Sequence, residues 1–166
     1  MTSAVKELAT STDFDFWMGR WNVRNRRLAR RLAGSVEWDE FDSKVAARAL
    51  PGGLGNEDVF CTDYGGGFVG MSFRFYDPES DQWSIYWADT RRPGLLDPPV
   101  VGSFRGDLGT FEGEDTLDGR PIRVRFTWSG VDTPTPRWEQ AFSDDDGETW
   151  ETNWVMDFTR ALEVAA

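Results

Sequence analysis

The chain of 166 residues carries 29 acidic against 18 basic residues, holds nine tryptophans and contains no histidine. Its net charge of −11 excludes nucleic acid and anionic membranes as main partners, because both need a basic protein surface. The missing histidine removes serine–histidine catalysis, histidine-ligated zinc and histidine-ligated haem. Since Cys61 is also the only cysteine, we expect neither a metal site nor a cofactor.

This length favours one domain, and we expect a flexible tail over residues 1–12 followed by a single domain over 13–166. The first residues lack the apolar stretch of a secretory signal, and no apolar run is long enough to cross a bilayer. A lone cysteine cannot form an internal disulfide, which is typical of a reducing compartment. We therefore expect a cytoplasmic protein without a membrane partner.

Hydrophobic alternation with a period of two predicts short strands along most of the chain. A single helical turn is expected first, within 14–21, after the capping residues Ser11, Thr12 and Asp13. Strands are then expected over 21–32, 36–50, 57–62, 68–76, 83–88, 100–105, 110–117, 122–129 and, as a final hairpin, within 138–160. The first of these also fits a helix, but its length and context favour a strand. A slip in the alternation at 39–41 predicts a β-bulge.

The connections are as informative as the strands. Asp118-Gly119 is a strong hairpin signal, and the longest connection, 90–99, holds three prolines and is expected to be an ordered flap. About ten strands joined by hairpin-length turns predict an all-β protein, either an up-and-down antiparallel β-barrel or a sandwich. If strand direction simply alternates, Trp21 and Arg160 lie at the same end of a closed barrel.

Gly19, Arg20 and Trp21 match the Gly-x-Trp signature that opens lipocalin-type (calycin) barrels. This resemblance implies a short 3₁₀ turn that plugs one end of the barrel. It also implies an arginine from the last strand, Arg160 here, stacked on the tryptophan. The barrel is therefore expected to be lipocalin/calycin-like and closed by its first and last strands.

The whole stretch 14–160 resembles a bacterial family of lipocalin-like single-domain barrels that is classed as a domain of unknown function. The shared blocks are FDFWMGRW, FRFYDPESDQWSIYWAD, DPPVVGSFRGDLGTFEGED, RVRFTW and GETWETNWVMDFTR. The family has no settled activity, so the resemblance implies a fold and not a function. Related ten-stranded barrels that bind haem use an axial histidine, which this chain lacks.

Aromatic rows are expected inside the barrel, because an exterior of Trp, Phe and Met side chains promotes aggregation. Among them is the row Val69, Met71, Phe73 and Phe75. The few polar residues with the same parity would then lie in a core or in a ligand cavity. The candidate ligand-binding residues are Asn25, Arg27, Phe73, Trp87, Trp138, Gln140, Thr152 and Trp154. The alternative is a filled core in which these side chains satisfy one another.

The favoured function is binding of a small, largely apolar or aromatic molecule inside the barrel, with entry beside the 90–99 flap. The alternative is a cofactor-independent cyclase, isomerase or lyase acting on a hydrophobic intermediate. Its catalytic candidates are Glu40 and Arg27, because a buried guanidinium needs a carboxylate or an anionic ligand. A third reading is a scaffold with a filled core, which leaves a homodimer open.

Two further features are interpreted as structural. Ser143 to Trp150 matches the Ser-x-Asp-x-Gly-x-Thr-Trp pattern found on hairpins of glycosidase propellers, and no sialidase activity is inferred from it. Cys61 has no adjacent base in the sequence and is expected to be a small core residue and not a nucleophile.

Overall fold

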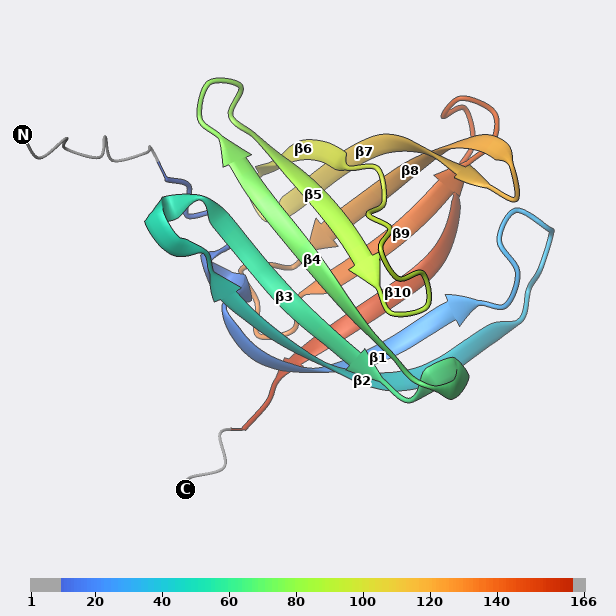
Figure 1. The fold of residues 1–166 in the computed structure, drawn as a ribbon, viewed down its shortest axis with the longest axis horizontal. Helices are drawn as coiled ribbons and strands as arrows, with labels where there is room; N and C mark the ends of the chain where they lie inside the picture. Colours follow the sequence, from blue (N-terminus) through green and yellow to red (C-terminus); the bar gives the residue numbers. More distant parts are fainter. Residues whose placement is uncertain (1–9, 163–166) are drawn as a thin grey trace, which may run out of the picture.

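Residues 10–162 are described by a computed structural model, in which ten antiparallel strands form one closed barrel (Figure 1). Each strand pairs with its neighbours in sequence, and β1 pairs with β10 to close the sheet. The strands are β1 (Gly19–Leu28), β2 (Trp38–Ala49), β3 (Gly55–Thr62), β4 (Phe68–Asp77), β5 (Gln82–Asp89), β6 (Val100–Arg105), β7 (Leu108–Leu117), β8 (Arg120–Ser129), β9 (Arg137–Ser143) and β10 (Glu151–Arg160). The predicted up-and-down, lipocalin/calycin-like barrel is confirmed.

The connections divide between two ends of the barrel, as the alternating strand direction requires (Figure 1). The end that carries the 90–99 flap, here called the flap end, also carries the connections 29–37, 63–67, 118–119 and 144–150. The other end, the closed end, is plugged by the 3₁₀ turn η1 (Asp15–Trp17). Residues 1–9 of the expected tail lie outside the described residues. No helix within 10–162 is long and apolar enough to cross a membrane.

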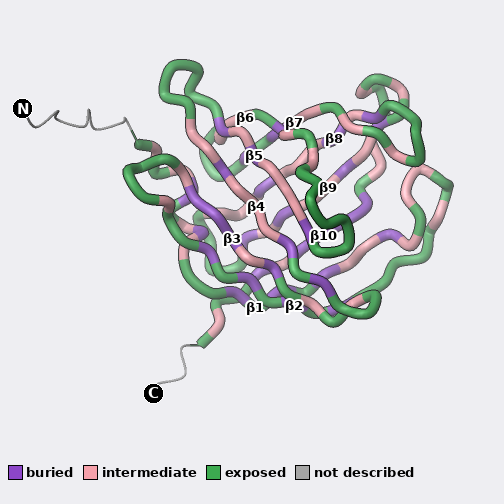
Figure 2. The backbone as a smooth tube through the Cα atoms, in the orientation of Figure 1, coloured by how far each residue is buried: buried purple, intermediate pink, exposed green. Residues whose placement is uncertain are grey.

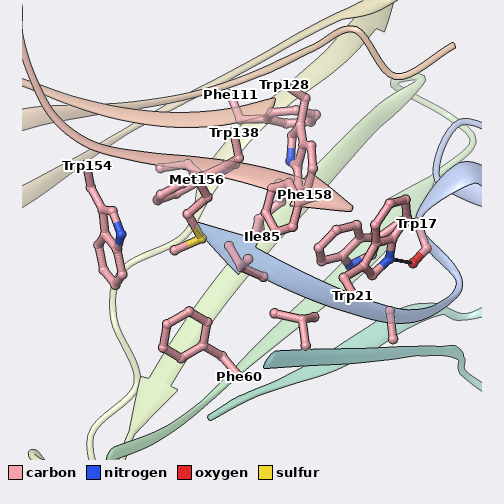
Figure 3. Packing of buried hydrophobic residues seen from close by; sticks show 14 of the residues in the cluster. Trp17, Trp21, Phe60, Ile85, Phe111, Trp128, Trp138, Trp154, Met156 and Phe158 are labelled. Carbon is pink, nitrogen blue, oxygen red and sulfur yellow. Dashed lines mark hydrogen bonds between the residues drawn. The ribbon is translucent and has the colours of Figure 1, made fainter. Parts of the chain in front are cut away.

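The closed end is built as the lipocalin resemblance implies. Trp17 and Trp21 stack with ring centroids 5.4 Å apart, and Trp21 Nε1 donates to Trp17 O at 2.8 Å (Figure 3). The Arg160 guanidinium lies 3.8 Å from the Trp21 ring centroid and donates to Phe16 O at 2.6 Å and to Met18 O. Gly19 has φ +108°, and a Cβ there would lie 2.8 Å from Arg160 Nη1, so the close approach of the arginine needs glycine.

The first two strands are more regular than the sequence pattern predicts. β1 is a strand, as expected, but it ends at Leu28, and its pairing with β2 runs without a register shift from Gly19 to Leu28. The bulge expected at 39–41 is therefore wrong. Trp38, Asp39 and Glu40 are all exposed, so the apparent slip reflects a strand end in solvent and not a change of face. The register shift lies in β10 instead, between Thr152 and Trp154.

The strand β4 presents the face opposite to the expected one. Arg74 is 4% exposed and points into the barrel, whereas Val69 is 41% exposed. The predicted inward row of Val69, Met71, Phe73 and Phe75 is therefore wrong. Inside the barrel Arg74 Nη1 lies 2.6 Å from Asp58 Oδ2 on β3, and this ion pair decides the face. Cys61 on β3 is exposed, so the expectation that it is a small core residue is also wrong.

Buried and exposed residues alternate along most strands (Figure 2). The hairpin loop 144–150 is held by its own bonds: Asp145 accepts from Ser143 Oγ at 2.7 Å and from Thr149 Oγ1 at 2.5 Å. These bonds lower the pKa of Asp145 to about 2, with Thr149 contributing most. Trp150 Nε1 donates to Gly147 O at 3.1 Å. The motif at this hairpin closes a turn.

Candidate functional site

The interior of the barrel holds a cavity of about 560 Å³. Its lining runs from Trp17, Asp58 and Arg74 toward the closed end to Arg27 and Asp97 at the flap end. Binding sites for small molecules commonly have volumes of about 300–1,000 Å³. The interior is thus hollow and large enough for a ligand, unlike the filled core that was the alternative.

Aromatic side chains from several strands contribute to the cavity wall. Trp138 on β9 and Trp154 on β10 meet edge to face with centroids 5.8 Å apart, and Phe60 on β3 meets Trp154 at 6.0 Å (Figure 3). Trp87 on β5 packs against Phe60 at 6.0 Å. The three tryptophans predicted to contact a ligand therefore line one cavity. Flat apolar rings stack well on such walls.

Trp87 is held in place from two sides. Its Nε1 donates to Asp89 Oδ2 at 2.9 Å. Gly70 on β4 lies against the ring, and a Cβ at that position would be 2.1 Å from Trp87 Cη2. The wall at Trp87 thus depends on a glycine in the neighbouring strand, which sequence reasoning did not identify.

Two predicted polar residues have different roles. Asn25 is fully buried and does not line the cavity: its Oδ1 accepts from Trp154 Nε1 at 3.0 Å, and its Nδ2 donates to Ser43 Oγ at 2.8 Å. Asn25 is a positioning residue for Trp154. Gln140 does line the cavity, and its Nε2 donates to Asn153 Oδ1 at 2.8 Å.

Two other predicted ligand contacts lie away from the cavity. Thr152 is exposed, because the register shift in β10 places Asn153, which is 0% exposed, inside in its stead. Phe73 lies on the outer face of β4, since its neighbour Arg74 points inward. Both corrections have one cause: side chains alternate along a strand, so an unrecognised shift or a reversed phase moves every residue to the other face.

Arg27 lines the cavity near the flap end, but it is not paired with Glu40. Its guanidinium lies 4.6 Å from the Trp154 ring centroid. Burial, together with repulsion from Arg31 and Arg91, lowers its pKa to about 10. Glu40 is exposed and pairs with Arg24 at 2.6 Å on the outer face. The expected pair is wrong because the unbulged register sets Glu40 opposite Arg26 and not Arg27.

An ionic cluster that the sequence reading missed anchors the flap. The buried carboxylate of Asp89 accepts from Arg91 Nη2 at 2.8 Å and from the backbone N–H of Arg91 at 2.9 Å, besides its bond from Trp87. These bonds, chiefly those from Arg91, hold the pKa of Asp89 well below its usual range. Arg92 pairs with Asp97 at 2.7 Å, yet burial raises the pKa of Asp97. The Asp-x-Arg spacing directly after a strand was the available signal.

A second missed cluster lies deeper in the cavity. Asp58 accepts from Trp17 Nε1 at 3.1 Å and pairs with Arg74 at 2.6 Å. Arg74 Nη1 also donates to Asn56 Oδ1 at 3.1 Å. The reversed phase expected for β4 hid this network, because it placed Arg74 outside the barrel.

Comparison with known proteins supports the fold but gives no family. No family model and no curated protein matches the sequence. Among solved structures, the chain is similar to the S-type phycobiliprotein lyase CPES from Guillardia theta, with a TM-score of 0.53 and 11% sequence identity. The match covers 91% of this chain and 92% of that one. The two chains therefore share a barrel architecture over nearly their full lengths.

Proposed function

We propose that this protein binds a small, largely apolar or aromatic molecule inside the barrel. The observation that carries the proposal is the cavity of about 560 Å³ walled by Trp87, Trp138 and Trp154. Burial of an apolar ligand in it would contribute about 25 cal/mol per Å² of apolar surface removed from water, and ring stacking adds to this. The ligand enters at the flap end, since η1 and Trp21 plug the other end.

Other parts of this proposal rest on sequence. We assign the chain to the lipocalin-like family of unknown activity that its sequence blocks resemble, with a bacterial source and a cytoplasmic location. We expect no nucleic-acid partner, because the net charge is −11. The similar solved structure is named as a lyase, which agrees with a barrel that holds a small molecule.

The test uses N-phenyl-1-naphthylamine, an uncharged aromatic probe whose fluorescence rises in apolar surroundings. We expect saturable binding that quenches tryptophan emission and raises the melting temperature. Trp154→Ala should weaken binding about tenfold, because it removes part of the stacking wall. Trp38→Ala is the matched control, since Trp38 is 37% exposed on the outside of the barrel. No saturable binding by the wild type, or equal losses in both variants, would refute the proposal.

One observation favours the enzymatic alternative, a cofactor-independent cyclase, isomerase or lyase. Asp97 lines the cavity, and burial raises its pKa, as is common for acid–base groups. Asp97 thus replaces Glu40 as the acid–base candidate. A ligand recovered from the protein would be incubated with wild type and with Asp97→Asn, then analysed by mass spectrometry and chromatography. Conversion that Asp97→Asn abolishes supports catalysis, and unchanged ligand in both samples argues for binding alone.

A further inference from the structure

Arg27 brings a positive charge to the cavity wall without a carboxylate to balance it. No ion pair found within residues 10–162 includes Arg27. Its Nε is buried and has no hydrogen-bond acceptor among those residues. Arg27 as a whole is half-buried, and withdrawing part of a guanidinium from water in this way is costly unless an anion compensates it.

The other charges of the cavity isolate Arg27 further. Three lining arginines have carboxylate partners: Arg74 pairs with Asp58 at 2.6 Å, Arg91 with Asp89 at 2.8 Å and Arg92 with Asp97 at 2.7 Å. Arg31, which also lines the cavity, forms no ion pair within the described range and adds positive charge beside Arg27. The β1 side of the cavity mouth therefore carries unbalanced positive charge.

On the side of the mouth away from β1 lie carboxylates that form no ion pair within the described range. Glu114, Asp115 and Asp118 come from β7 and its turn, and β8, β9 and β10 separate β7 from β1 in the closed sheet. Glu114 and Asp118 are exposed, so water and salt screen their charges. The mouth is thus polarised, and an acidic ligand has one favourable orientation, with its acid toward β1.

The polar atoms of the cavity wall that lack a partner are also suited to an acidic ligand. Besides Arg27 Nε, they are Arg74 Nε and Trp128 Nε1 among the described residues. All three are N–H donors, and buried donors need acceptors. A ligand rich in oxygen acceptors would satisfy them, whereas a pure hydrocarbon would not.

We propose that the natural ligand is an aromatic acid, a flat ring system bearing a carboxylate or similar anionic group, and that Arg27 binds that group at the flap end. This inference rests on the proposed function and names its ligand class. The geometry suits such a molecule, because the Arg27 guanidinium lies only 4.6 Å from the Trp154 ring centroid. The ring system stacks against the tryptophan wall while its acid group meets the guanidinium.

The experiment compares two probes that share one aromatic body. N-phenyl-1-naphthylamine is uncharged, and 8-anilinonaphthalene-1-sulfonate is the same body with a sulfonate added. Both are titrated into the wild type, Arg27→Met and Arg24→Met, the last removing the same charge from the exposed face of β1. We expect Arg27→Met to weaken sulfonate binding at least tenfold and to change binding of the uncharged probe less than twofold. Arg24→Met should change neither.

A further variant guards against a folding defect. Arg27→Lys keeps the charge, so it should retain sulfonate binding within about fivefold of the wild type, with near-ultraviolet circular dichroism as the check on folding. Sulfonate binding that survives Arg27→Met, or falls equally in Arg24→Met, overturns the assignment of Arg27 while leaving the cavity proposal intact. If the wild type binds neither probe, the cavity proposal itself fails.

Discussion

Trp154 owes its place in the cavity wall to its neighbours. Asn25 accepts a hydrogen bond from its indole nitrogen at 3.0 Å, Trp138 meets it edge to face, and Arg27 covers its ring. Because Asn25 is itself fully buried and bonded to Ser43, the indole is fixed by a chain of polar contacts behind the wall. At the scale of single residues, Asn25 and Ser43 help to shape the cavity although neither lines it.

Gly70 offers a test at this scale. In Gly70→Ala the new methyl group would overlap the end of the Trp87 ring, which must move. We expect binding of N-phenyl-1-naphthylamine to weaken about tenfold, while the free energy of unfolding falls by about 1 kcal/mol. Val69→Ala is the control, since Val69 is 41% exposed on the outside of the same strand. Unchanged binding in Gly70→Ala would show that Trp87 does not shape the occupied part of the cavity.

At the scale of elements, the 90–99 flap stands out because it is tied to the barrel by specific contacts. Asp97 N donates to Trp87 O at 2.8 Å, and Arg91 reaches back to Asp89 while its guanidinium lies 3.7 Å from the Phe68 ring centroid. These contacts order a loop whose Leu95 and Leu96 are 60% and 56% exposed. Asp89 thus anchors the start of a flap that borders the cavity mouth.

Asp89→Asn should loosen the flap and make stability less dependent on pH. The folded pKa of Asp89 lies below its ordinary value of 3.8, so its contribution is present above that value and lost as pH falls below it. At pH 6 we expect Asp89→Asn to lower the free energy of unfolding by about 2 kcal/mol, because a buried charged hydrogen bond is lost. Urea unfolding at pH 6 and pH 3 should show this difference shrinking toward the lower pH.

A matched substitution separates this effect from general charge loss. Asp107→Asn removes an exposed carboxylate in the β6–β7 turn at the closed end, and we expect it to be neutral at both pH values. Trypsin provides a second readout, since cleavage after Arg91 should be faster in Asp89→Asn alone. Equal cleavage of all three proteins would mean that Asp89 does not hold the flap.

At the scale of the whole molecule, the barrel depends on the seam between its first and last strands. β1 and β10 pair from Trp21 opposite Arg160 to Arg27 opposite Trp154, so one seam joins the closed end to the cavity wall. Arg160 fastens this seam to η1 through two backbone carbonyl groups. Within the described range each strand pairs with a neighbour on both sides, over only three residues between β5 and β6, which limits the sheet edge open to edge-to-edge pairing.

Arg160→Met should destabilise the protein but leave ligand binding nearly unchanged. We expect the free energy of unfolding to fall by about 1–2 kcal/mol, from the loss of the stacking on Trp21 and of the bonds to Phe16 O and Met18 O. Probe binding should stay within twofold, because the cavity opens at the flap end. Arg20→Met, at an exposed position of β1, is the control in thermal unfolding. A large loss of binding would place Arg160 within the site.

A homodimer, which the sequence leaves open, is not tested by the structure. The outward row of β4, with Met71, Phe73 and Phe75 half-buried and Val69 exposed, gives the exterior an apolar strip that the sequence reading had placed inside. Light scattering after size-exclusion chromatography measures the molar mass and decides between monomer and dimer. The cytoplasmic location likewise stays a prediction.

The sequence alone determined the all-β class and the order of the strands. Period-two alternation and turn residues located all ten strands, and strand parity brought Trp21 and Arg160 to one end, because both signals are local and repeat along the chain. Trp87, Trp138 and Trp154 were also predicted as wall residues from parity alone.

Only the tertiary structure decided which face is inside and which charges meet. On β4 both faces carry apolar residues, so alternation is ambiguous, and the contact of Arg74 with Asp58 on another strand resolves it. The shift at Thr152 and the separation of Glu40 from Arg27 depend on register with neighbouring strands. The hollow interior depends on how side chains from all around the barrel fill it. These are contacts between distant residues, which no local pattern encodes.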